Sequence, residues 1–171
     1  MQLRIRDDIN KSSDMVNQME WMRRQLDDAA RALRSNKEKA DLLKSVEAMD
    51  EKIRGVEYKI LNKALTTSDD KYFIEAYKIY FNLMWLNGEV GPGAGDVAGG
   101  ADYAPTETSR NLLEMIEKDL AAATAEYRTL MDKDLPAFNR SLADHGVTPL
   151  TAAIPVSSAD KGDTGEPQDH D

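Results

Sequence analysis

Apolar side chains recur every three or four positions along most of this chain, a spacing that places them on one face of an α-helix. Three stretches show the pattern over many turns, at about 7–34, 37–65 and 107–144. Charged and polar residues fill the positions between them. The pattern therefore predicts three long amphipathic helices, each with one side turned toward a core.

The stretch 37–65 carries the most regular pattern, with steps that alternate between four and three as in the seam of an antiparallel bundle or coiled coil. The apolar positions are Leu42, Val46, Met49, Ile53, Val56 and Ile60. Ser35 followed by Glu38 predicts a capping box ahead of this helix. Gly55 inside a helix costs about 1 kcal/mol relative to alanine, so we expect another helix to approach closely there.

The first and last long helices have their own apolar stripes. In the first, the stripe consists of Ile5, Ile9, Val16, Met19, Met22, Leu26, Ala30 and Leu33. In the last, it consists of Leu113, Ile116, Leu120, Ala123, Tyr127 and Leu130, and after a slip of one position Leu135, Phe138 and Leu142 continue it. Pro136 predicts a kink or break just before it. Thr106 is the expected N-cap of this helix, and His145-Gly146 is its expected end.

A further helix is predicted for 69–86, capped by Thr67 or Ser68. Its expected stripe consists of Phe73, Tyr77, Tyr80 and Met84. The apolar surface extends well beyond that stripe, through Ile74, Phe81, Leu83 and Trp85. A helix that is apolar on most sides is typically buried. We therefore expect this helix to be the most buried of the four, or to meet a partner.

The chain divides into four parts on this evidence. Helices one to three occupy 1–86, a linker with six glycines between 88 and 100 occupies 87–105, the fourth helix occupies 106–146, and a flexible acidic tail occupies 147–171. Short connections make successive helices antiparallel neighbours. The predicted fold is all-α: an elongated antiparallel four-helix bundle, or a three-helix bundle plus a docked helix, with a Gly-rich connector and a disordered tail.

Composition and charge narrow the classes of function. The chain has 171 residues, no cysteine and a formal net charge of −9. The absence of thiols excludes disulfides, zinc–thiolate sites and a cysteine nucleophile. The negative charge opposes nucleic-acid binding. No stretch reaches the roughly 20 apolar residues of a membrane span, and no signal peptide opens the sequence.

Catalytic and metal-binding patterns are not apparent. The two histidines, His145 and His170, lie at a helix end and in the tail, and neither has a glutamate three positions before it as a di-iron bundle requires. Paired aspartates such as Asp27-Asp28 are sequence neighbours, which point about 100° apart on a helix and do not face each other. We therefore assign no catalytic, cofactor-binding or metal-binding residue, and expect no cofactor.

Two segments carry a family resemblance. Ile5-Arg6-Asp7-Asp8-Ile9 leads to Glu20-Trp21-Met22-Arg23-Arg24-Gln25-Leu26, and Asp134-Leu135-Pro136-Ala137-Phe138-Asn139 follows much later. Over roughly 3–147 the chain resembles the helical C-terminal region of bacterial exported proteins with sortilin-like, BNR-repeat β-propellers, often labelled glycosyl hydrolases. The resemblance implies a module that supports or docks propeller domains in an exported parent. It brings no catalytic residue, because hydrolase activity is expected in the propellers.

The function that follows from the sequence is a non-enzymatic scaffold or docking module for protein–protein association. The interaction residues we expect are Tyr77, Phe81, Trp85 and Trp21, because aromatic side chains anchor many interfaces. The expected partner is a protein: the parent propeller, a second copy or another assembly partner. Two alternatives stay open, namely a metal- or small-molecule-dependent enzyme built in the bundle core, and an inactive fragment of a glycan-processing hydrolase.

Overall fold

The computed structural model describes residues 1–66, 75–91 and 104–154. Every regular element in those residues is helical. The long elements are α1 (Gln2–Leu33), α2 (Ala40–Ile60), α3 (Ile79–Val90), α4 (Glu107–Thr129) and α5 (Leu135–Asp144). The short ones are the 3₁₀ turns η1 (Lys37–Lys39) and η2 (Lys63–Thr66) and the π-turn η4 (Leu130–Asp134). The predicted all-α fold is confirmed.

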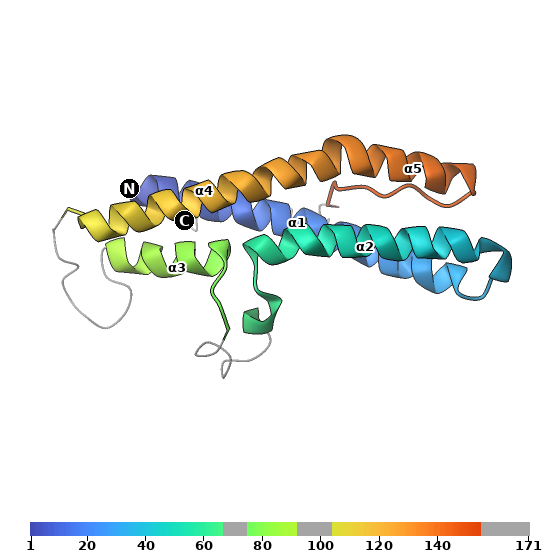
Figure 1. The fold of residues 1–171 in the computed structure, drawn as a ribbon, viewed down its shortest axis with the longest axis horizontal. Helices are drawn as coiled ribbons and strands as arrows, with labels where there is room; N and C mark the ends of the chain where they lie inside the picture. The colour runs from blue at the N-terminus through green and yellow to red at the C-terminus, as the bar shows by residue number, and fades with distance from the viewer. Residues whose placement is uncertain (67–74, 92–103, 155–171) are drawn as a thin grey trace, which may run out of the picture.

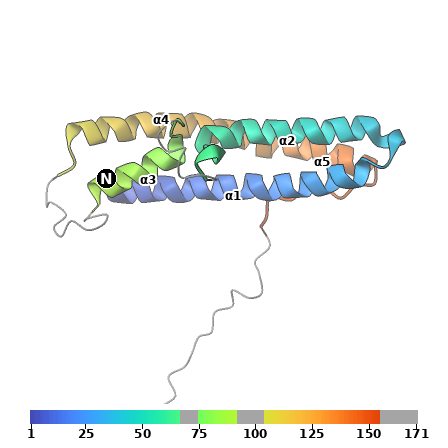
Figure 2. The same ribbon diagram turned by 90° about the horizontal axis from the view of Figure 1, so that it is seen from below.

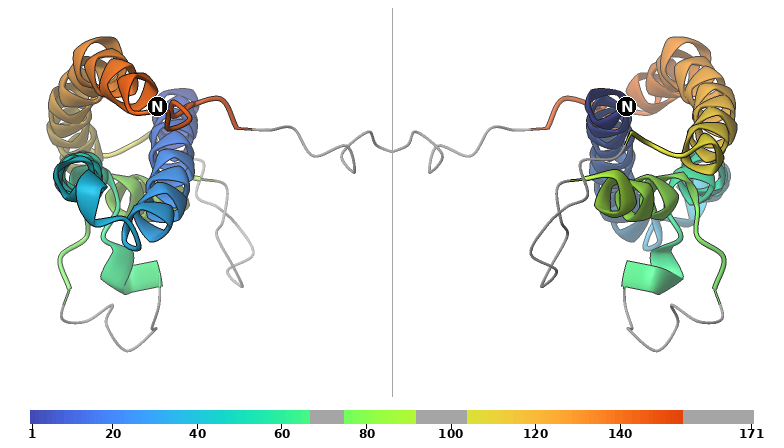
Figure 3. Two further views of the ribbon diagram at one scale, coloured as in Figure 1. Left: turned by 90° about the vertical axis from the view of Figure 1, so that its right-hand side faces the viewer. Right: turned by 90° about the vertical axis from the view of Figure 1, so that its left-hand side faces the viewer.

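The helices form an elongated bundle of three rods (Figure 1). One rod is α1, which runs the whole length, and the opposite rod is α4 continued by α5. The third rod is made of two pieces, because α2 covers one half of α1 and α3 covers the other half in the same direction (Figure 2). Seen from its ends, the molecule is triangular in cross-section (Figure 3). The helices therefore do not alternate in direction as a four-helix up-down-up-down bundle requires.

The apolar stripes predicted for the three long helices form the core. All six positions of the seam on α2 are buried, as are most stripe positions of α1, α4 and α5. Ile9, Tyr127 and Phe138 are partly buried and pack against the same cluster. Gly55 is different, because it is exposed and a Cβ built on it meets no atom within 4 Å. The expected close helix approach at Gly55 is wrong.

Capping at the helix ends follows the sequence in two of three places. Thr106 accepts a hydrogen bond from the Ser109 N–H, as an N-cap does. Gly146 adopts a φ of +69°, and the Val147 N–H reaches back to the Leu142 carbonyl to close α5. The other cap is wrong: instead of a Ser35–Glu38 box, Asn36 accepts from the Glu38 N–H at 3.0 Å, and Ser35 donates to the Ala32 carbonyl.

The middle rod breaks earlier than predicted, because α2 ends at Ile60 and Leu61 is extended. The Asn62 side chain accepts from the Ala64 N–H and donates to the Ala76 carbonyl, so it joins the two ends of the excursion between α2 and α3. Asparagine side chains compete with helical backbone bonds in this way. The proposed caps Thr67 and Ser68 lie outside the described residues.

The third helix begins ten residues later than predicted, at Ile79, and turns a different side to the core. Its buried side chains are Ile79, Leu83 and Leu86. Two members of the predicted stripe lie outward, since Met84 is 46% exposed and Tyr77 precedes the helix and is 36% exposed. Phe73 and Ile74 lie outside the described residues. Only Met84, Trp85 and Glu89 among its 12 residues are exposed, a smaller share than in any other α-helix described, which agrees with the expectation that this helix is the most buried. Aliphatic residues, not the predicted aromatic stripe, form its inner side.

The π-turn η4 explains the slip in the last stripe. The Leu135 N–H bonds to the Leu130 carbonyl five residues back, instead of four as in an α-helix. One extra residue therefore fits into the turn while Leu130 and Leu135 both stay buried. Pro136 lies in the first turn of α5, where its missing N–H does little harm. The sequence predicts a kink or a break just before Pro136; the structure has no break there, since Asp134 and Leu135 keep helical backbone angles, and the irregularity takes the form of the π-turn.

The segment 147–154, here called the C-terminal strap, runs back along α5 toward the middle of the bundle (Figures 1 and 3). The Asn139 amide on α5 pairs with both backbone groups of Leu150, and the Gln25 amide on α1 pairs with both backbone groups of Thr151. The Leu150 side chain is 6% exposed. The predicted tail, 147–171, thus begins with a docked segment, and 155–171 lie outside the described residues.

Candidate docking surface

One side of α3 packs into the core through Ile79, Leu83 and Leu86. The opposite side is also apolar but does not face the core. Phe81, Met84 and Trp85 lie away from the buried positions Leu83 and Leu86. Trp85 is 53% exposed and Met84 is 46% exposed. We call Tyr77, Phe81, Met84 and Trp85 the α3 outer face. A helix with apolar residues all round usually has neighbours on all sides, whereas the described rods lie against the inner side of α3.

The aromatic rings at the start of α3 form a cluster. The ring centroids of Tyr77 and Phe81 are 6.1 Å apart, and those of Tyr80 and Phe81 are 5.7 Å apart in an edge-to-face arrangement. Both distances lie in the favourable range for aromatic pairs. The Asn82 amide donates to the Tyr77 carbonyl and holds the chain at the entrance to the helix. These contacts hold the aromatic rings in one arrangement at the start of α3.

The structure brings together three of the four interaction residues expected from the sequence. Tyr77 and Phe81 are in contact, and Trp85 lies one turn further along α3. Trp21 is separate, because it lies on α1 where Gln25 donates to its carbonyl and to that of Thr151. Its indole N–H is buried and has no hydrogen-bond partner among the described residues. Trp21 thus belongs to the neighbourhood of the C-terminal strap and not to the α3 outer face.

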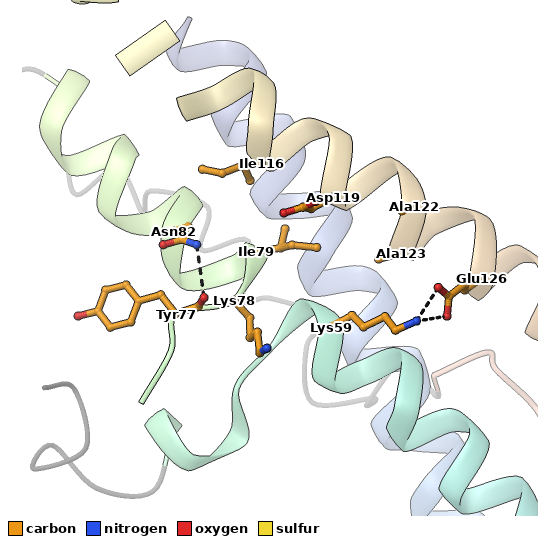
Figure 4. A pocket seen from close by; sticks show the side chains of 10 residues that line it. All are labelled: Lys59, Tyr77, Lys78, Ile79, Asn82, Ile116, Asp119, Ala122, Ala123 and Glu126. Atoms are coloured by element: carbon orange, nitrogen blue, oxygen red, sulfur yellow. Dashed lines mark hydrogen bonds and ion pairs between the residues drawn. The ribbon is translucent and has the colours of Figure 1, made fainter. Parts of the chain in front are cut away.

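A cavity of about 430 Å³ opens where α2 ends and α3 begins, against α4 (Figure 4). Its floor is apolar and is formed by Ile79, Ile116 and Ala123. Across its rim the Lys59 ammonium on α2 binds the Glu126 carboxylate on α4. The lining contains no histidine and no serine, so a nucleophile–base pair is not assembled there. The cavity is a notch with an apolar floor and a charged rim, which Lys78 and Asp119 share with Lys59 and Glu126.

Sequence reasoning missed a buried ionic cluster between α1 and α2. The Arg23 guanidinium binds Asp50 at 2.9 Å and Glu57 at 2.6 Å, and Glu57 is fully buried. Arg54 binds the other oxygen of Asp50 at 2.8 Å, and the Lys63 ammonium lies 4.0 Å from the second oxygen of Glu57. In an antiparallel pair joined by a turn near residue 36, position 23 faces position 50. The register of this antiparallel pair could therefore have revealed the cluster from the sequence.

This cluster holds two helices together and leaves little room for chemistry. Desolvation lowers the pKa of Arg23, but the hydrogen bonds that it donates to Asp50 and Glu57, together with the attraction of their charges, outweigh this effect, so the pKa is raised overall. A general acid or a metal ligand needs carboxylate oxygens open to a ligand, and Arg23 occupies one oxygen of each carboxylate. Within 1–66, 75–91 and 104–154, no three acidic or histidine side chains are grouped to hold a metal.

Comparison of the chain with protein-family models, curated proteins and solved structures finds no match. The resemblance to propeller-associated helical regions therefore stays an expectation from the sequence. Among the helices that the structure describes, none is both long and apolar enough to span a membrane.

Proposed function

We propose that this protein is a non-enzymatic helical-bundle module for protein–protein association, and that it docks through the α3 outer face. The observation that carries the proposal is the pair Met84 and Trp85, about half exposed on the helix with the most apolar sequence. Tryptophan and methionine are enriched in interfaces relative to other surfaces. A partner that covers them removes apolar area from water, the main favourable contribution to association.

The way α3 is attached supports this proposal. Its inner side is held by the buried residues Ile79, Leu83 and Leu86, with Tyr80 and Val90 partly buried against the same core. No ion pair between described residues involves α3. The long helices are cross-linked by charge instead, as where Arg4 on α1 binds Glu117 on α4. A short helix with few specific bonds to its own bundle can present its outer side to another protein.

The resemblance adds a context for such a module. As an accessory to a larger exported propeller protein, it would dock the propeller, a second copy of itself or another component of an assembly. All three partners are proteins, and all three would bury the same apolar residues. The experiment below identifies which of them binds.

A photoreactive benzoylphenylalanine in place of Trp85 tests the proposal in the full-length chain. The variant is irradiated alone and in an extract of the source cells, and adducts are identified by mass. We expect a protein adduct at position 85. The matched control carries the same group at Tyr58, an aromatic residue on α2 that is 42% exposed. Absence of an adduct at 85, or equal yields at 85 and 58, would overturn the proposal.

A further inference from the structure

We propose that the surface beneath the C-terminal strap is a binding site for an extended segment of another protein, and that the strap is the competing occupant of that site. This surface, here called the strap seat, consists of Gln25 on α1, Asn139 on α5 and the part of the core that Leu150 joins. It lies in the opposite half of the bundle from α3 (Figure 1). The inference therefore goes beyond the proposed function.

The polar contacts of the strap seat bind backbone groups and do not depend on which side chain is present. The Asn139 amide donates to the Leu150 carbonyl at 2.9 Å and accepts from the Leu150 N–H at 2.8 Å. The Gln25 amide pairs in the same way with Thr151, at 2.8 and 3.0 Å. Every residue except proline carries these two backbone groups. The two amides can therefore hold another extended chain, as main-chain hydrogen bonds do in peptide recognition.

The side-chain requirement of the strap seat is small. Leu150 is 6% exposed, whereas its neighbours Pro149 and Thr151 are exposed. Val147 and Ala152 are partly buried against the core. The strap seat thus selects one aliphatic side chain among small or solvent-facing neighbours. A segment of another protein with leucine at this position meets the same requirement.

The strap can leave its seat while the helices stay folded. It follows Gly146, whose φ of +69° starts the turn back along α5. Its principal contacts are the two amide pairs and the side chain of Leu150, and these are offset by the entropy lost in ordering its backbone. Segments of this kind open locally. Because the strap is tethered, it competes at an effective concentration on the order of millimolar, so a partner must bind better than the strap does.

An unsatisfied donor beside the strap gives a partner the means to bind more tightly. Trp21 lies one helical turn before Gln25, and the Gln25 amide donates to the carbonyls of both Trp21 and Thr151. The Trp21 indole N–H is buried and has no hydrogen-bond partner among the described residues. A buried donor without a partner is unfavourable, so the strap is an imperfect occupant. A segment that brings an oxygen of serine, asparagine or aspartate to this N–H gains a bond that the strap does not make.

Fluorescence anisotropy of a labelled peptide with the sequence of residues 147–154 measures access to the strap seat in the full chain. Leu150→Ala weakens the hold of the strap, so the seat is open more often, and the peptide should bind this variant at least tenfold more tightly than wild type. Thr151→Pro removes the N–H that Gln25 accepts and should act in the same direction without changing a core side chain. The control is Ile154→Ala, whose side chain is 48% exposed and whose loss should leave binding unchanged.

Two further variants show whether the peptide binds at the strap seat. In the Leu150→Ala background, Asn139→Ala should weaken peptide binding about tenfold because two hydrogen bonds are lost. Asn111→Ala changes an exposed asparagine on α4 and should have no effect. Alanine at the leucine position of the peptide should abolish binding. Circular dichroism shows whether each variant keeps its helical content, and a peptide that binds none of the folded variants would overturn the proposal.

Peptides with serine, asparagine or aspartate at each of the positions 151–154 test what a partner adds. At least one should bind more tightly than the strap sequence, and Trp21→Phe, which lacks the indole N–H, should cancel that gain. If no peptide exceeds the strap sequence, the seat suits the strap alone and the proposal is overturned. A wild-type dimer in sedimentation equilibrium that Leu150→Ala abolishes would identify the strap of a second copy as the occupant and would also overturn it.

Discussion

The two halves of the bundle are stabilised in different ways. The half that contains α2, α5 and the strap has its rods tied by the Arg23 cluster and by the amide pairs of Gln25 and Asn139. In the half that contains α3 and α4, Arg4 on α1 binds Glu117 on α4, but α3 itself is held mainly by apolar contacts. Large exposed apolar residues are distributed accordingly. In the α3 half they are Leu3, Tyr77, Met84, Trp85 and Met115, and in the α2 half they are Tyr58 and Ile154.

Polar and apolar contacts play different parts in the two halves of the bundle. Buried charge and side-chain amides accept one geometry only, because a misplaced partner leaves a polar group unsatisfied. Apolar contact is less directional. The exposed apolar side chains of the α3 half could therefore be covered by another protein surface without leaving a polar group unsatisfied. The α2 half fixes the shape of the bundle, and the α3 half carries the surface through which we propose that it docks.

The largest effect is expected from removing the centre of the buried ionic cluster. Arg23→Met leaves the carboxylate of Glu57 buried without its main partner and should lower the free energy of unfolding by about 3–5 kcal/mol. Urea unfolding followed by circular dichroism measures it. The control is Arg54→Met, whose side chain is 36% exposed and whose loss should cost below about 1 kcal/mol. A loss for Arg23→Met as small as that for Arg54→Met would show that the buried ionic cluster does not stabilise the α2 half.

The C-terminal strap should contribute measurably to the free energy of unfolding through the buried side chain of Leu150. Leu150→Ala removes a side chain that is 6% exposed and should cost about 2–4 kcal/mol of unfolding free energy. Its control, Ile154→Ala, changes a side chain that is 48% exposed and should cost less than about 0.5 kcal/mol. If both losses are small, the strap lies on the surface of the bundle without contributing to its stability.

The two sides of α3 should separate stability from association. Trp85→Ala should change the unfolding free energy of the monomer by less than about 1 kcal/mol, while Leu83→Ala should lower it by about 2–4 kcal/mol. Thermal melts at low protein concentration, where chains are dissociated, compare the two. A destabilisation by Trp85→Ala as large as that of Leu83→Ala would mean that the outer face is already covered within the chain.

The smallest effect concerns Asp8 in the α3 half. Burial, followed by repulsion from Glu117, raises the pKa of Asp8 above its usual value. The folded chain therefore binds this proton more tightly than the unfolded chain, and the stabilising contribution present at acid pH is lost as the pH rises through the raised pKa. Asp8→Asn should stabilise the protein at neutral pH by less than about 1 kcal/mol.

Melting curves of wild type and Asp8→Asn between pH 3 and pH 7 check this sign, and the advantage of the variant should disappear at the acid end. Asp7→Asn is the neighbouring control, because the Asp7 carboxylate is 71% exposed. A variant that is less stable than wild type at neutral pH would contradict the expectation.

The predictability of the fold depended on how narrow each apolar stripe is. On α1, α2 and α4 the stripes are narrow, so periodicity alone determined which side is buried. On α3 nearly every position is apolar, and Leu83, Met84 and Trp85 are three consecutive examples. Periodicity then leaves the rotation of the helix undetermined. The inner side was settled by aliphatic packing, which one sequence does not reveal.

Two further features could not be derived from periodicity. The strap is extended and is held by amide side chains of Gln25 and Asn139 that are remote in sequence, so no local pattern announces it. Glu57 follows the seam residue Val56 directly and looks like a solvated charge until the register of α1 against α2 is known. Of the expected docking residues, Phe81 and Trp85 fall on one side of α3 because they are one helical turn apart, and Tyr77, which precedes the helix, contacts Phe81. Trp21 had no positional argument behind it.

The π-turn between Leu130 and Asp134 has a consequence for how such a chain can change over generations. A hydrogen bond to the carbonyl five residues back, in place of four, results when one residue is inserted into an α-helix and the turns on either side keep their orientation. Growth or loss at this point is absorbed locally, and neither end of the rod has to rotate. An added or lost residue at this point would therefore leave the packing of α4 and of α5 each in its own register.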